Sequence, residues 1–124
     1  MQGSGRGQRT WAMAHFEELE RCVSLVGERK LQPRDMAVLV ALMSHINPVT
    51  GKVEVTAKKL AEGLAMAYTD TVGSITRLRK ELVVTRLVDD RSGVPYYLLN
   101  PHVVSVGTGK ERGYLWKRFS DSLN

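Results

Sequence analysis

The sequence of 124 residues contains a single cysteine, Cys22, and aromatic residues make up only 6% of it. One cysteine excludes an internal disulfide and a zinc site built from several cysteines. Long apolar runs are also missing, because the longest, Met36 to Met43, is far shorter than the ~18 residues of a membrane-spanning helix. No hydrophobic segment follows the first ten residues, as one would in a secretory signal. We therefore expect a soluble cytoplasmic protein without a membrane partner.

Acidic residues are the minority among the charged side chains. Lys and Arg number 18 against 13 Asp and Glu, which gives a net charge of +5 and a pI near 9.6. This modest excess favours a polyanionic partner. Apolar residues make up 43% of the chain, enough for the core of one domain. We expect residues 1–10 to form a flexible basic arm, either a disordered terminus or a DNA-contacting segment, and residues 11–124 to form one domain with its core at about 31–101.

Side chains that could carry catalysis or hold a metal are few. The histidines His15, His45 and His102 fall in different predicted elements, and none has a second ligand at metal-binding spacing. Cys22 has no flanking histidine or aspartate and is predicted to be a buried thiol. Residues 107–111, GTGKE, lack the first glycine and the final Ser or Thr of a phosphate-binding loop, so a flexible linker is predicted there. We predict no enzyme activity, no cofactor, no metal and no small-molecule substrate.

The spacing of apolar residues predicts the order of the elements. In the first helix, Phe16, Leu19, Val23 and Val26 recur at three- and four-residue intervals and are expected to form its buried face. The predicted elements are a strand at 11–14, helices at 15–26 and from 33 to about 46, a strand at 53–55, a helix capped by Thr56 that ends near Gly63, a helix capped by Thr69 that runs to about Glu81, a hairpin of strands 83–88 and 94–99, and a tail helix from about Gly113 to Leu123. The order helix, short strand, helix, turn, helix, hairpin predicts an α+β fold, a winged helix-turn-helix with an added N-terminal strand and helix and a C-terminal helix.

The helix predicted from Thr69 has the two faces that a DNA-reading helix needs. A major groove admits such a helix when one face packs on the domain and the other offers hydrogen-bond donors. The expected buried face consists of Thr71, Ser74, Ile75, Leu78 and Leu82, and the expected outward face of Thr69, Gly73, Thr76, Arg77 and Lys80. Arg77 is predicted to pair with a guanine edge. Gly73 fits either a close approach to DNA or a contact with the preceding helix.

Further basic residues are predicted to contact phosphates. Arg79 and Lys80 belong to the reading helix, and Lys58 and Lys59 lie at the start of the helix before it, where Thr56 would also present free backbone N–H groups. Arg91 lies at the tip of the hairpin. The full set of predicted DNA-binding residues is Thr56, Lys58, Lys59, Tyr68, Thr69, Gly73, Thr76, Arg77, Arg79, Lys80 and Arg91. The partner is expected to be double-stranded DNA, because the tyrosines do not form the paired aromatic platform of a single-strand binder.

The stretch from Leu31 to Asn100 resembles the winged-helix replication proteins of the RepL type, which occur on bacterial plasmids and related phage elements. The resemblance rests on the opening WAMAHFEEL, the helix VTAKKLAEGLAM and a hairpin that ends in Asn100-Pro101, and from that opening to Pro101 it covers about three quarters of the chain. Leu82 stands where such proteins often place a glycine. MarR-like regulators share the core pattern. The family implies duplex DNA binding in a bacterial or phage-infected cell, without nuclease chemistry.

Three functions remain open on the sequence. The first is replication initiation or control on a plasmid or phage, the second a small transcription regulator, and the third a protein-interaction module that does not bind DNA. One winged helix reads only a short half-site, so a homodimer is expected. Leu115, Trp116 and Phe119 of the tail helix either pack on the first helix or pair with a second protomer.

Overall fold

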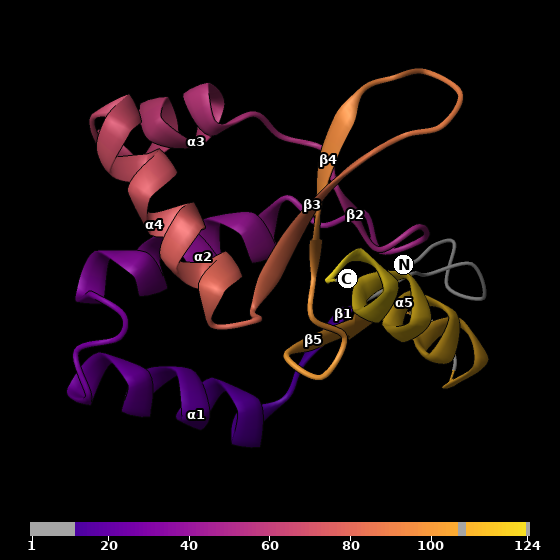
Figure 1. Cartoon of the computed structure of the whole chain (residues 1–124), viewed down its shortest axis with the longest axis horizontal. Coiled ribbons are helices and arrows are strands. Elements are labelled where there is room, and N and C mark those ends of the chain that lie inside the picture. Colours follow the sequence, from indigo (N-terminus) through magenta and orange to yellow (C-terminus); the bar gives the residue numbers. More distant parts are fainter. Residues whose placement is uncertain (1–11, 107–108, 124) are drawn as a thin grey trace, which may run out of the picture.

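The computed structural model describes residues 12–106 and 109–123 (Figure 1). Residues 1–10, predicted to be an arm, and Trp11, Gly107 and Thr108 lie outside the described residues. The elements in chain order are β1 (Ala12–Ala14), α1 (Phe16–Gly27), α2 (Pro33–Ser44), β2 (Lys52–Val53), α3 (Ala57–Leu64), α4 (Tyr68–Lys80), β3 (Val84–Val88), β4 (Pro95–Leu99), β5 (Val104–Val106) and α5 (Gly109–Ser122).

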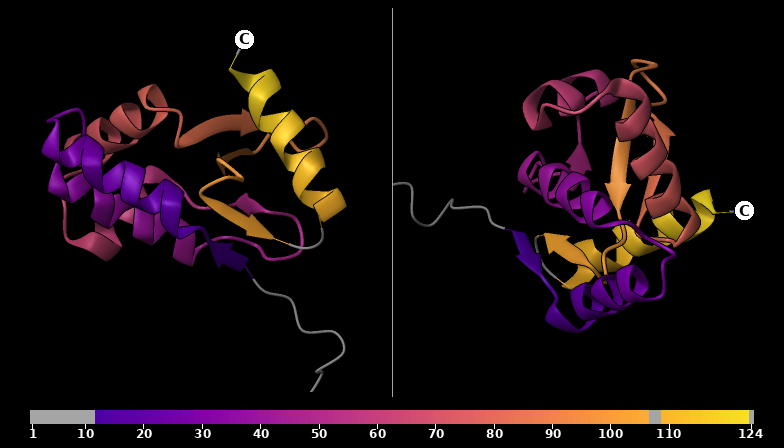
Figure 2. Two further views of the ribbon diagram at one scale, coloured as in Figure 1. Left: turned by 90° about the horizontal axis from the view of Figure 1, so that it is seen from below. Right: turned by 90° about the vertical axis from the view of Figure 1, so that its left-hand side faces the viewer.

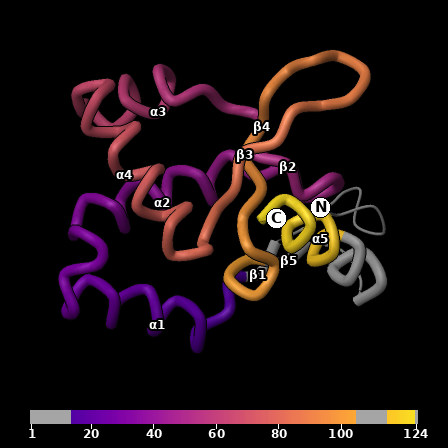
Figure 3. The backbone as a smooth tube through the Cα atoms, viewed as in Figure 1, coloured from indigo at the N-terminus to yellow at the C-terminus, as the bar shows by residue number. Residues whose placement is uncertain are grey.

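The middle of the chain is a winged helix, as the sequence predicted. Helices α2, α3 and α4 pack together, and β2, β4 and β3 form an antiparallel sheet in that order. The β3–β4 hairpin pairs Val84 with Leu99 and Val88 with Pro95, and its loop projects beyond the helices as the wing (Figure 3). Outside this core, β1 pairs with β5, so the two ends of the winged helix are held side by side. No helix in the part of the chain that the structure describes could cross a membrane.

Helix α2 lies at the centre because it is apolar on several sides. Pro33 occupies its first turn, and Gln32 and Asp35 form a reciprocal capping box in which Asp35 accepts from the Gln32 backbone N–H at 2.7 Å. Val38, Leu39 and Leu42 are fully buried and pack in one core with residues of α3, α4 and the sheet. This helix is therefore the support on which the other two helices rest.

The helices α3, α4 and α5 differ in how well the sequence predicted where they begin. Thr56 caps α3 as predicted, because its hydroxyl oxygen accepts from the Lys59 backbone N–H at 3.1 Å. Helix α4 begins one residue before Thr69, and Ala67 is its N-cap, so the prediction that Thr69 is the cap is wrong. Helix α5 begins at Gly109, so the predicted linker at 107–111 is wrong for its last three residues.

Helix α4 ends in a left-handed turn at a leucine. Leu82 has φ of 62°, and the Val83 N–H donates back to the Leu78 carbonyl at 2.9 Å, a pattern in which glycine is common. The Leu82 carbonyl accepts from the Asn100 side chain at 3.0 Å. Because the chain turns here, Leu82 leaves the buried face of the helix and is 49% exposed. The prediction that Leu82 is buried is therefore wrong.

Helix α1 buries only part of the predicted face, because Leu19 and Val26 pack against the core but Phe16 and Val23 do not. Cys22 and Leu25 are its buried residues, whereas Phe16 is 80% and Val23 60% exposed. The predicted face did not include Cys22, which packs here as a small apolar side chain. The observed buried face is therefore shifted around the helix by about one residue from the predicted one. Burial is also the main cause that raises the pKa of the Cys22 thiol. The expectation of a buried thiol is confirmed. The expectation that Phe16 and Val23 belong to the buried face is wrong.

Helix α5 packs on the outer side of the β3–β4 hairpin and does not pack on α1. Its Leu115 and Phe119 pack against Tyr96 and Leu98 of β4. Arg118 also donates to the Tyr96 hydroxyl at 2.7 Å. Leu115 and Phe119 therefore do not pack on α1 and are buried in their own domain, whereas Trp116, the third residue of the predicted set, is 40% exposed. The tail helix therefore completes the core of its own domain and braces the wing.

Candidate nucleic-acid interface

The described basic residues fall into two groups according to whether a carboxylate neutralises them. Ion pairs within 4.0 Å join Arg21 to Glu18, Lys30 to Glu28, Arg34 to Asp70, Lys52 to Asp89 and Arg77 to Asp35. Within residues 12–106 and 109–123, no such pair involves Lys58, Lys59, Arg79, Lys80, Arg86 or Arg91. These six cations come from α3, α4, β3 and the wing loop. They are free to attract a polyanion, as are Arg29 and Lys117, which belong to none of these pairs either but lie in other parts of the fold.

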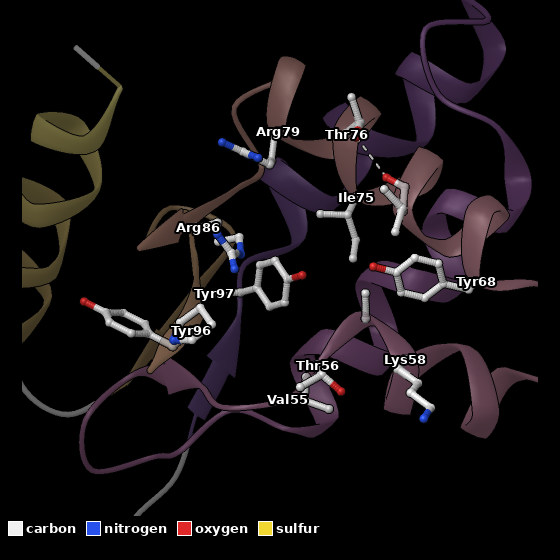
Figure 4. Close-up of a pocket in the computed structure, with 13 residues that line it drawn as sticks. Val55, Thr56, Lys58, Tyr68, Ile75, Thr76, Arg79, Arg86, Tyr96 and Tyr97 are labelled. Carbon is white, nitrogen blue, oxygen red and sulfur yellow. Dashed lines mark hydrogen bonds between the residues drawn. The ribbon is translucent and has the colours of Figure 1, made fainter. Parts of the chain in front are cut away.

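A hollow of about 360 Å³ lies between α4, the start of α3 and the base of the wing, and we call it the wing hollow. Its lining brings together Lys58 of α3, Arg79 of α4 and Arg86 of β3, each from a different element. Tyr68 and Tyr97 face one another across it, with Arg86 beside the Tyr97 ring (Figure 4). The apolar floor is formed by side chains of α4 such as Ile75. Among the described residues that line it there is no Asp or Glu, so its charge is wholly positive.

The electrostatics around Tyr97 reflect this positive environment. Burial raises the pKa of the Tyr97 hydroxyl, and the Arg86 and Arg79 guanidinium groups act against burial by favouring the phenolate. Arg86 also makes a hydrogen bond with this side chain. The neutral hydroxyl of Tyr97 therefore stands at the inner end of a cationic surface, where it can donate a hydrogen bond to an anion.

The structure contradicts the prediction that Arg77 lies on the outward face of α4. Its guanidinium lies between α4 and α2, where Nε and Nη2 donate to the two carboxylate oxygens of Asp35, both at 2.8 Å. Asp35 is fully buried. Burial alone would raise the pKa of Asp35, but hydrogen bonds from Arg77, Ser74 and the Gln32 N–H lower it below its ordinary value. The placement of Arg77 on the outward face is wrong, and with it the argument that this residue reaches a guanine edge.

Gly73 has room for a side chain. The atoms nearest to a Cβ built on it belong to the Arg77 guanidinium, at 3.5 and 4.0 Å, which is ordinary van der Waals contact. The suggested contact with the preceding helix is therefore not the reason for this glycine. Close approach to DNA stays a prediction.

The other predicted site residues lie at the surface. Lys58 and Lys59 are exposed on the first turn of α3, next to the capping Thr56. The remaining exposed residues are Tyr68, Thr69, Thr76, Arg79 and Lys80 of α4 and Arg91 of the wing. Thr56, Lys58, Tyr68, Thr76 and Arg79 line the wing hollow, whereas Lys59, Thr69, Lys80 and Arg91 do not. Their contacts with DNA remain predictions.

Sequence reasoning missed several residues that line the wing hollow, among them Val72, Arg86 and Tyr97. Val72 belongs to neither predicted face of α4, yet it is partly exposed on the outward one. Arg86 is an exposed charge within an otherwise apolar strand, and that interruption of the run Val83–Val88 is the signal that could have marked it. Tyr97 is buried among sheet residues, and only the three-dimensional structure shows that it borders the hollow.

The wing is fixed at its base by charged groups. Lys52 Nζ of β2 lies 2.9 Å from Asp89 Oδ2 and 4.7 Å from the centre of the Tyr96 ring. The backbone N–H of Ser92, then the Lys52 ammonium and the Arg91 N–H, hold the pKa of Asp89 well below its usual range. Asp89 thereby closes the wing loop, so its charge is already satisfied beside Arg91. The acidic Asp89 near Arg91 is part of the loop's structure rather than a free repulsive charge.

Among known proteins, similarity to this chain is found at the level of structure and not of sequence. No family model matches the chain, and no curated protein matches it. A solved structure of a point mutant of S. aureus MepR is similar over 86% of this chain and 68% of that one, with 15% identity and a TM-score of 0.46. The winged-helix architecture follows from the order and packing of this chain's own helices and strands. The resemblance to RepL-type proteins gains no support from the family models.

Proposed function

We propose that this protein binds double-stranded DNA, with α4 in the major groove and the wing hollow against a phosphate strand. The observation that carries the proposal is the convergence of Lys58, Arg79 and Arg86, from three elements, on a hollow whose described lining contains no acidic residue. Phosphate contacts supply most of the non-specific affinity for DNA, and they require cations that no carboxylate has already neutralised. The start of α3 adds backbone N–H groups, which favour an anion at a helix N-terminus.

The exposed face of α4 carries the groups proposed to read bases. Thr69, Val72 and Thr76 are exposed along it at three- and four-residue spacing. A threonine hydroxyl can bond to base edges, and the Val72 side chain can contact a thymine methyl group. These two residue types take the reading role that Arg77 cannot fill while it is bound to Asp35.

The exposed fractions of Tyr68 and Tyr97 favour duplex DNA over single strands as the ligand. Stacking on bases needs exposed ring faces in succession. Tyr68 is 57% exposed but Tyr97 only 7%, so the pair cannot offer two platforms.

We propose that the DNA-binding activity serves as a small transcription regulator at an operator. Both this role and a role at a replication origin use the same contacts. The replication role came only from the family resemblance, which the family models do not support. Neither role needs an enzyme activity. Among the described residues no three His, Cys, Asp or Glu side chains gather as a metal ion would need.

The test is the salt dependence of binding to a labelled duplex of mixed sequence. Between about 50 and 200 mM salt the affinity should fall by several orders of magnitude, because each neutralised phosphate releases counterions. Lys58→Ala should make the slope of log affinity against log salt shallower by about 1. Lys30→Ala removes the same charge from a residue paired with Glu28, outside the hollow, and should leave the slope nearly unchanged. Affinity that is absent or insensitive to salt would refute the proposal and favour a protein-interaction module.

A second copy of the chain is expected on a DNA site with two half-sites. Leu115 and Phe119 are occupied within the domain, which leaves the exposed Phe16 and Val23 of α1 as apolar residues for a contact between protomers. We expect sedimentation of the protein with the duplex to show two copies, and Phe16→Glu to reduce this to one without loss of the folded state. Two copies in spite of Phe16→Glu would place the contact elsewhere.

A further inference from the structure

A second groove lies on the other side of α4, between its C-terminal half, the start of β3 and the end of α5. It has a volume of about 390 Å³ and we call it the tail groove. Lys80 and Arg79 line one wall and Ser122 and Leu123 the other, with Thr85 of β3 between them. Figure 2 shows that the C-terminal end of α5 projects to the same side of the molecule as α4 in both views. The described lining contains no Asp or Glu.

The two hollows share Thr76 and Arg79, so this part of α4 is a ridge with a hollow on each side. A helix in the major groove lies between two phosphate backbones, one from each strand, about 12 Å apart. A ridge flanked by two cationic hollows matches that arrangement. The wing hollow meets one strand, and the tail groove is placed to meet the other.

We propose that the tail groove is a second phosphate-binding surface, which holds the DNA strand opposite to the one at the wing hollow and makes the end of α5 part of the interface. The inference rests on the proposed function, since it assigns a second contact to the same α4. Its ligand is the sugar-phosphate backbone of duplex DNA. Lys80 supplies the charge that belongs to this groove alone, while Arg79 borders both hollows, and neither is paired with a carboxylate of the described residues.

The far wall of the groove is held in place by hydrogen bonds. The Ser122 hydroxyl donates to the Phe119 carbonyl at 2.6 Å and lies 3.2 Å from the Thr85 hydroxyl oxygen. Phe119 is itself fully buried under the hairpin. These contacts fix the last turn of α5 to β3, beside the cations of α4. The nearby acids, Glu81 and Asp121, do not line the groove.

Charge placed at Ser122 tests the proposal in the full chain. Ser122→Arg should strengthen binding to the mixed-sequence duplex and steepen the salt slope by about 1. Ser122→Glu should weaken binding about fivefold, as one charge a few ångströms from a phosphate would. The same substitutions at Ser24, an exposed residue of α1 that lines neither hollow, change the net charge equally and are the controls. Equal effects at Ser122 and Ser24 would overturn the inference.

A second experiment does not depend on α5 keeping its position. Lys80→Ala and Lys58→Ala should each lower the salt slope by about 1, and their effects should add, because the two residues meet different strands. Hydroxyl-radical footprints of the two strands of one duplex should then lose protection on one strand with Lys80→Ala and on the other with Lys58→Ala. Loss on the same strand with both variants would refute the second groove. If the unmodified protein shows no salt-dependent binding, the proposed function fails as well, and the two failures are thereby distinguished.

Discussion

Arg77→Ala is expected to lower the free energy of unfolding by about 3–5 kcal/mol, because it leaves the Asp35 carboxylate buried without its cation. The bidentate pair joins α4 to the first turn of α2, where Asp35 also accepts from the Gln32 N–H. The loss therefore affects both the helix cap and the contact between the two helices. Urea denaturation followed by circular dichroism measures it.

The matched control is the second ion pair between the same two helices. Arg34 and Asp70 approach to 3.6 Å, but their side chains are 44% and 47% exposed. Arg34→Ala should therefore cost less than about 1 kcal/mol. In the double variant Asp35→Leu, Arg77→Met no buried charge remains, and much of the lost stability should return. The account is contradicted if the double variant loses as much stability as the single variants Asp35→Leu and Arg77→Met lose when their separate losses are added.

The pH dependence of the Arg77→Ala effect follows from the direction of the Asp35 pKa. In the native protein this pKa lies below its ordinary value, so the carboxylate stabilises the fold above that ordinary value and the contribution is lost as the pH falls through the lowered one. Without Arg77 the buried carboxyl can relieve its charge only by taking up a proton. The difference in unfolding free energy between native protein and variant should therefore be largest at neutral pH and shrink as the pH falls below the ordinary pKa of an aspartate.

The case of Arg77 shows where sequence reasoning stops. Helical spacing correctly placed Thr71, Ser74, Ile75 and Leu78 on the buried face of α4. Arg77 stands at the border of that face, and spacing alone gives its angle but not what its long side chain reaches. Its partner, Asp35, lies 42 residues earlier in the chain. Only tertiary structure brings the two together, so an outward donor and a buried ion pair were indistinguishable in the sequence.

Local chemistry was more predictable than long-range contact. The Thr56 cap and the hairpin at 84–99 follow from residue types that act on their immediate neighbours, and both were predicted. The packing of α5 on the hairpin was not, because an apolar helix face fits any apolar surface. Both hollows depend on such packing: Arg86 borders Tyr97 only through the pairing of β3 with β4, and Ser122 reaches Thr85 only through α5. The sequence therefore placed Lys58 and Arg79 in the candidate site, but it missed Arg86, misplaced Arg77 and gave no indication of the shape of either hollow.

The triple variant Lys58→Ala, Arg79→Ala, Arg86→Ala is expected to lower the affinity for duplex DNA on the order of 100-fold at low salt and to make the salt slope shallower by about 3. Each substitution removes one cation of the wing hollow. The three residues are exposed at the surface, and truncation of exposed side chains usually changes stability little. Fluorescence anisotropy with a labelled duplex, repeated over a series of salt concentrations, gives both quantities.

The control for the triple variant carries the same change of net charge outside both hollows. Arg29→Asn, Lys30→Ala and Lys117→Ala together remove three exposed cations, and asparagine suits the left-handed φ of 65° at Arg29. If binding follows net charge alone, the two triple variants weaken it equally, and the wing hollow has no special part in it. If the hollow holds a phosphate strand, only the first loses the affinity and the slope. The two outcomes differ because the salt slope reports the number of phosphates that the protein neutralises at close range. Cations farther away contribute little to it, since their charge is screened within a Debye length of about 8 Å at physiological salt.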